Sequence, residues 1–216
     1  MRARGKNPLG ESALHSKRPV QVALNYTEPE INLRAIATAV NRPQQAKQLL
    51  KKTEQQIAAA RQTFAPIVTD RPKLLLLYSA QLKQITLSSP NQLCHSLPQE
   101  LGFQPVSLSK LETPQPNSPP TPISIEKLPQ LNDADSVIVL GYNQGQGKQL
   151  NNFEQSQLSD IKQAWSDNAI AQSLDASQAG RVYFIPGYLC SGLPGAIGTK
   201  LYLEELKEQL LPSQPN

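Results

Sequence analysis

Lys73-Leu-Leu-Leu-Leu-Tyr-Ser79 is a run of strand length that contains four consecutive leucines. Such a continuous apolar run is typical of a strand covered on both faces, whereas a half-exposed strand alternates apolar and polar residues. Residues 135–141 (DSVIVLG) and 181–186 (RVYFIP) have the same character. The sequence therefore predicts three buried strands at these places.

Helical patterns lie between these strands, over residues 91–101, 153–165 and 168–179. A last helix is expected over residues 196–211, with Leu203, Leu206 and Leu210 on its buried face. Pro98 interrupts the first of these patterns, so we expect that helix to start late or to kink. Strands that alternate with helices predict a Rossmann-like α/β fold, in which helices flank a mostly parallel sheet.

A long amphipathic helix precedes the strands. Apolar residues recur at helical spacing from Leu50 to Phe64, and Pro43 suits the first turn of such a helix. We expect the helix to end before Pro66. The predicted organisation is an irregular basic arm over residues 1–29, a long helix region over 30–66 and an α/β lobe over 72–212.

Charge and hydropathy exclude several classes of function. The net charge of +4 arises in the first 18 residues, and the remaining chain has equal numbers of basic and acidic residues. This neutral remainder carries no basic stripe, so we expect no nucleic-acid partner. No apolar run approaches the roughly 18 residues that cross a bilayer, and residues 1–30 lack the pattern of a signal peptide.

Catalytic and metal sites have no clear candidates. The segment from Gly141 to Lys148 follows a predicted strand, but its spacing departs from that of a phosphate-binding loop. There are two histidines, and no carboxylate pair stands out as an acid and a base. Cys94 and Cys190 match no zinc or redox spacing and could pair only if the fold brings them together. We expect no enzyme, no catalytic residue and no protein-bound metal.

Several segments together suggest a family. They are Asn32-Leu-Arg-Ala-Ile-Ala37, Ile123-Ser-Ile-Glu-Lys-Leu128 with Asp133-Ala-Asp-Ser-Val-Ile-Val139, Ala176-Ser-Gln-Ala-Gly-Arg-Val-Tyr-Phe184, and Gly187-Tyr-Leu-Cys-Ser-Gly192. In this order they resemble the substrate-binding proteins of iron-siderophore and vitamin B12 ABC importers, whose two lobes are joined by one long helix. The resemblance covers residues 30–211, which correspond to the connecting helix and the C-terminal lobe. About 30 residues stand where the family has its N-terminal lobe, so a truncated binding protein is expected.

The resemblance implies a function in transport. The protein would bind a ferric siderophore and deliver it to the permease subunits of an ABC importer, together with an N-terminal lobe if one is supplied separately. The chelator would hold the iron, so no cofactor is implied; a corrinoid or haem remains an alternative ligand. The family is periplasmic, whereas the chain would be cytoplasmic if Met1 is the true start. The alternative function is a stand-alone interaction or regulatory module, or an inactive remnant that no longer transports.

The resemblance also suggests where ligand and permease would bind. In open α/β sheets ligands lie at the carboxyl ends of the strands. The expected ligand wall therefore consists of residues that end or follow the three strands, namely Ser79, Ala80, Tyr142, Asn143, Tyr188 and Cys190. Glu126 stands where the family carries a glutamate that docks on the permease.

Overall fold

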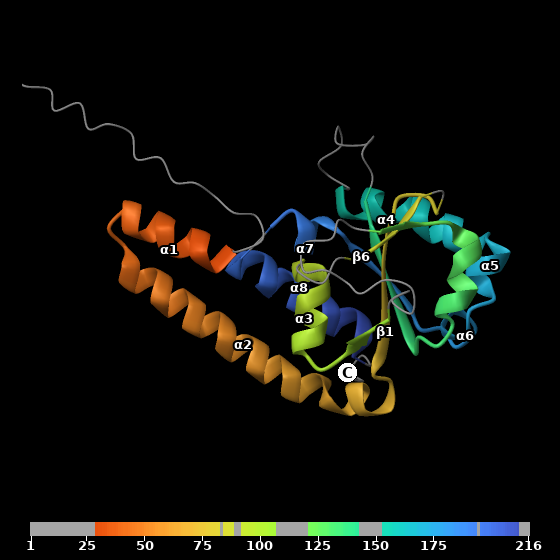
Figure 1. Cartoon of the computed structure of the whole chain (residues 1–216), viewed down its shortest axis with the longest axis horizontal. Helices are drawn as coiled ribbons and strands as arrows, with labels where there is room; N and C mark the ends of the chain where they lie inside the picture. Colours follow the sequence, from red (N-terminus) through yellow and green to blue (C-terminus); the bar gives the residue numbers. More distant parts are fainter. Residues whose placement is uncertain are drawn as a thin grey trace, which may run out of the picture.

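A computed structural model describes residues 29–82, 84–88, 92–106, 121–142, 153–193 and 195–211 (Figure 1). The strands are β1 (Lys73–Ser79), β2 (Ile85–Leu87), β3 (Gln104–Pro105), β4 (Thr121–Ile123), β5 (Ser136–Gly141) and β6 (Val182–Pro186). The longer helices are α1 (Pro29–Ala39), α2 (Pro43–Asp70), α3 (Leu93–Glu100), α4 (Phe153–Ser166) and α8 (Ala196–Leu210). The short ones are the 3₁₀ helix η1 (Ile125–Leu131), α5 (Ala169–Gln172), α6 (Asp175–Gln178) and α7 (Tyr188–Ser191).

The strands form one sheet in the order β4-β2-β1-β5-β6, and β3 pairs with the start of β1. The β1–β5, β5–β6 and β1–β3 pairs are parallel, while β2 pairs antiparallel with both β1 and β4. The predicted strands correspond to β1, β5 and β6, so the mostly parallel α/β fold is confirmed. The two short antiparallel strands were not predicted, because three residues carry too little periodicity.

Helices cover both faces of the sheet, as Figure 1 shows. Leu74 and Leu76 of β1 belong to a core that includes residues of α2, α3, α7 and α8. Leu75 and Leu77 belong to a second core, with residues of η1, α4, α5 and α6. Because successive side chains of a strand point to opposite faces, the leucine run serves both layers, as expected for a strand buried on both sides.

The long helix α2 continues past Pro66, so the prediction that it ends before this residue was wrong. Proline removes the bond to the carbonyl four residues earlier, which costs about 3 kcal/mol in an exposed helix. Here Phe64 and Ile67 are buried against the lobe on either side of the proline. This burial holds the last turn, and the helix ends at Asp70.

Helix α3 also continues through a proline, Pro98. It begins at Leu93, before this proline, and so does not start late as one of the two expectations had it. Pro98 has no N–H to donate to the carbonyl of Cys94, four residues earlier. The hydroxyl of Tyr202, on α8, donates to this carbonyl at 3.1 Å instead. The side chain of a distant helix therefore replaces the donor that the proline lacks.

Two further segments differ from expectation. The helix expected over residues 168–179 is two single turns, α5 and α6, because the backbone is extended at Leu174 between them. The proline-rich connection that ends at Pro122 contributes its last residues to β4. None of the helices among the described residues is long and apolar enough to cross a membrane.

Candidate functional site

The carboxyl ends of four strands meet at one edge of the sheet. Ser79, the last residue of β1, pairs with Gly141 of β5, which pairs in turn with Pro186 of β6. On the other side Ser79 pairs with Ile85 of β2, which faces the last residue of β4. The residues that follow β1, β5 and β6 are therefore brought together as the parallel topology predicts. We call this region the carboxyl edge.

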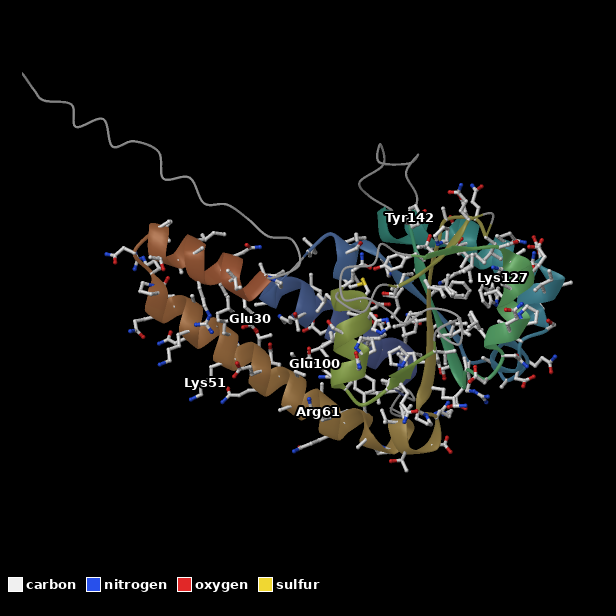
Figure 2. The ribbon with its side chains drawn as sticks, viewed as in Figure 1. Glu30, Lys51, Arg61, Glu100, Lys127 and Tyr142 are labelled. Atoms are coloured by element: carbon white, nitrogen blue, oxygen red, sulfur yellow. A yellow bond between two sulfur atoms is a disulfide. The ribbon has the colours of Figure 1, made fainter. Side chains whose placement is uncertain are left out.

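The expected ligand residues fall into two groups at this edge. Three of these residues are partly exposed: Ala80, Tyr142 and Tyr188. Ala80 directly follows β1, Tyr142 directly follows β5, and Tyr188 is the second residue after β6. Figure 2 shows Tyr142 at the top of the sheet. Ser79 and Cys190 are buried, with 0% and 3% of their surfaces exposed. Asn143 lies outside the described residues.

The buried hydroxyl of Ser79 holds the turn that follows β1. It accepts a hydrogen bond from the backbone N–H of Leu82 at 2.8 Å and donates to the carbonyl of Gln84 at 3.1 Å. Leu82 adopts a φ of 60°, an unfavourable conformation for a branched side chain. The serine thus shapes the loop behind Ala80 through the backbone.

Cys190 forms a disulfide with Cys94 and so joins α7 to α3. The sequence left this pairing open, because nothing in the spacing of two residues 96 positions apart reveals it. The hydroxyl of Tyr78, the penultimate residue of β1, contacts the Cys94 sulfur and lies 3.8 Å from the Cys190 sulfur. Burial raises the pKa of the Tyr78 phenol, while a hydrogen bond with the Ser191 side chain opposes the rise. The phenol therefore stays neutral beneath the carboxyl edge.

Tyr78 and Tyr202 are the residues of this region that sequence reasoning missed. Tyr78 lies in β1 and Tyr202 in α8, each at a position that an apolar residue would also fill. Tyr202 is fully buried. Burial raises the pKa of Tyr202, and the nearby Tyr78 raises it further. A buried tyrosine needs a partner for its hydroxyl, which is the one signal that could have drawn attention to them.

Glu126 is exposed in the first turn of η1. Since η1 follows β4, Glu126 lies near the carboxyl edge but at the end of the sheet away from β6. Its neighbour Lys127 is labelled in Figure 2, on the right of the molecule. The structure thus separates Glu126 from Tyr142 and Tyr188.

An open groove of about 550 Å³ lies where the loop after Ala80 meets α4. Polar residues, among them Gln81, Asp160, Gln163 and Asp167, make up most of its lining, although much of the surface they present is apolar. In the part of the chain that the structure describes, no group of three or more histidine, cysteine or acidic residues is placed to hold a metal ion. The partly exposed Tyr142 and Tyr188 give the carboxyl edge aromatic surface that a ligand can contact.

Comparison with known proteins gives the family. The family described as Periplasmic binding protein matches residues 20–189. The chain belongs to this family. The matched residues of this periplasmic binding protein include β1, β5, β6 and most of the carboxyl edge. No curated protein sequence matches the chain significantly.

Several solved structures share the fold. A FhuD-fold component of a Fep/Fec-like ferrichrome ABC transporter from Bacillus subtilis has a TM-score of 0.66 and 20% identity, over 86% of this chain and 64% of that one. The triscatecholate siderophore binding protein FeuA of the same organism, complexed with ferri-bacillibactin, has a TM-score of 0.62 and 18% identity, over 89% of this chain and 64% of that one. SirA of Staphylococcus aureus has a TM-score of 0.66 and 16% identity, over 89% of this chain and 68% of that one. The chain spans about 64% of the length of the first of these structures.

Proposed function

We propose that this chain supplies one ligand-binding wall of a periplasmic binding protein that presents a ferric siderophore to an ABC importer. One observation carries the proposal: the ends of β1, β5 and β6 gather Ala80, Tyr142 and Tyr188 at one edge of the sheet. Ligands of open α/β sheets bind at such an edge. Two structures of the same fold are described as parts of siderophore systems.

In this proposal the chelator carries the iron and the protein recognises the chelator. Tyr142 and Tyr188 would pack on its organic surface and hydrogen-bond its oxygens. The buried Ser79 and the bridged Cys190 would support the wall from behind rather than touch the ligand. Glu126, exposed on η1, would contact the permease, away from the two tyrosines.

The disulfide supports a location of the protein outside the cytoplasm. Disulfides persist in oxidising compartments and are rare where thiols are kept reduced. Both cysteines of the chain are engaged in this bridge. We therefore propose an extracytoplasmic location, in agreement with the family.

The test is a binding titration with ferrichrome and with ferri-bacillibactin, followed by calorimetry. It is run on the chain alone and with an N-terminal lobe from a relative. The second arm is needed because the α1–α2 hairpin exposes Ile36, Val40 and Leu49, a surface that a second lobe would cover.

A binding isotherm that weakens in Tyr142→Ala but not in Tyr183→Ala supports the proposal. Tyr183 is the matched control, because it is also partly exposed but lies toward the other end of β6. Absence of binding to either probe in both arms refutes the proposed function. Permease docking is tested separately by Glu126→Lys, with Glu208→Lys on α8, which is also exposed, as its control.

A further inference from the structure

Helix α7 carries Tyr188 and cannot hold its own position. It has four residues, Tyr188–Ser191, and helices of this length are unstable in isolation. Within it, the Ser191 hydroxyl bonds back to the carbonyl of Gly187 at 2.7 Å. The direction of Tyr188 must therefore be determined by the contacts of α7 with the rest of the lobe.

The strongest of these contacts is covalent. The bridge from Cys190 to Cys94 fastens α7 to α3, and both sulfurs lie beside the hydroxyl of Tyr78. Cys94 is itself held, because its carbonyl accepts the hydroxyl of Tyr202. The inner face of α7 is thus tied to a buried site.

The start of α7 is equally constrained. The N–H of Gly187 donates to the carbonyl of Gly141 at 2.8 Å, which continues the pairing of β5 with β6 into the first turn. A Cβ at position 187 would lie 3.3 Å from that carbonyl oxygen and 3.4 Å from the Tyr78 ring. The glycine permits a close approach that a side chain would disturb.

These two anchors fix the backbone that carries Tyr188. Residues two apart on a helix differ by about 200° around its axis, so Tyr188 and Cys190 lie on nearly opposite faces. Cys190 is 3% exposed and belongs to the core, whereas Tyr188 is partly exposed and packs against the edge of the same core. Anchoring the cysteine side consequently sets the direction in which the tyrosine faces the carboxyl edge.

We propose that the Cys94–Cys190 bridge, together with Tyr78, positions Tyr188 for ligand binding. This inference rests on the proposed function. It assigns the bridge a role in the bound state, beyond the general stabilisation that a disulfide gives by restricting the unfolded chain. Tyr78, Cys94 and Cys190 are positioning residues, since they act on the ligand through Tyr188.

A double-mutant cycle tests this role, with ferrichrome and ferri-bacillibactin as probes. Affinity is measured for the wild type, Cys94→Ala/Cys190→Ala, Tyr188→Ala and the combination, each shown by circular dichroism to be folded at the assay temperature. We expect a loss of about tenfold from removing the bridge, and no further loss when Tyr188 is already alanine. Tyr78→Phe, which keeps the bridge, should weaken binding by about threefold.

Leu174→Ala is the matched control for stability. Leu174 is buried in the core on the other face of the sheet, so its truncation destabilises the lobe without touching α7. Affinity should be unchanged in this variant. An equal loss of affinity in Leu174→Ala, or losses from the bridge and from Tyr188→Ala that simply add, would show that the bridge acts through stability alone and overturn the proposal.

Amide hydrogen exchange provides a readout that needs no ligand. Removing the bridge should raise exchange at residues 187–192 well above the change at β1 and β5, whereas Leu174→Ala should not do so selectively. Unchanged exchange at these residues overturns the positioning role, whatever the probes do. Failure of the wild type to bind either probe refutes the proposed function instead, so the two failures are distinguishable.

Discussion

The pairing of Pro98 with Tyr202 allows a quantitative prediction. The carbonyl of Cys94 has no N–H from Pro98, and the Tyr202 hydroxyl satisfies it at 3.1 Å in a fully buried position. Tyr202→Phe keeps the ring and leaves this carbonyl without its partner. A buried polar group without a partner costs about 1–3 kcal/mol, so we expect the variant to lose about 2 kcal/mol of unfolding free energy.

The proline makes the argument specific. In a Pro98→Ala background the alanine N–H can donate to Cys94, as in any regular helix turn. Tyr202→Phe should then cost less than about 1 kcal/mol, and the cycle should show a coupling of about 1 kcal/mol or more. Urea unfolding with the disulfide intact, followed by circular dichroism, measures all four proteins.

Thermal melting gives a second measure. A protein of this size shifts its Tm by about 2–4 °C per kcal/mol, so Tyr202→Phe should melt about 4–8 °C lower. Tyr183→Phe is the matched control, since it removes a hydroxyl from a partly exposed tyrosine of β6 and should change stability by less than about 0.5 kcal/mol. The same cost for Tyr202→Phe in both backgrounds would refute the reasoning.

Three further substitutions test other features. Ser79→Ala should lower the unfolding free energy by about 1–2 kcal/mol in urea, because the N–H of Leu82 loses its acceptor. Gly198→Ala should be destabilising by several times this amount, or prevent folding, since a Cβ there collides with the backbone of Leu193; soluble yield and Tm measure this. His95 is partly buried, which lowers its pKa below the ordinary 6.5, so the folded state binds fewer protons and stability falls as the pH falls below about 6.5. In urea unfolding between pH 7.5 and 5, His95→Gln should lose less unfolding free energy on acidification than the wild type. An unchanged pH dependence would contradict the role of His95.

The fold followed from apolar runs, and the errors came from tertiary contacts. A continuous run of leucines such as that of β1 indicates a strand covered on both faces, so the pattern alone was sufficient to predict this strand. The end of α2 was misjudged because the rule for Pro66 describes an exposed helix, whereas burial of Phe64 and Ile67 offsets the missing bond. Pro98 was misjudged for a related reason, since its compensating donor comes from Tyr202, more than 100 residues later.

The meeting of the strand ends was predicted, but the direction of each side chain there was not. The parallel order of β1, β5 and β6 brings their ends together, which spacing along the chain can indicate. Whether a residue at such an end faces outward depends on the turn that follows it. Ser79 turns inward to hold the loop and Cys190 turns inward to the bridge, and neither choice is visible in residue type alone.

The bridge also determines how the protein responds to proteolysis. Cys94 and Cys190 enclose β3, β4, β5, β6 and the helices between them. A single cut anywhere in that interval, including the proline-rich connection before β4, leaves two fragments that remain covalently joined. Such a nicked protein would migrate as one band until a reductant is added, and it could keep its sheet assembled in a compartment rich in proteases.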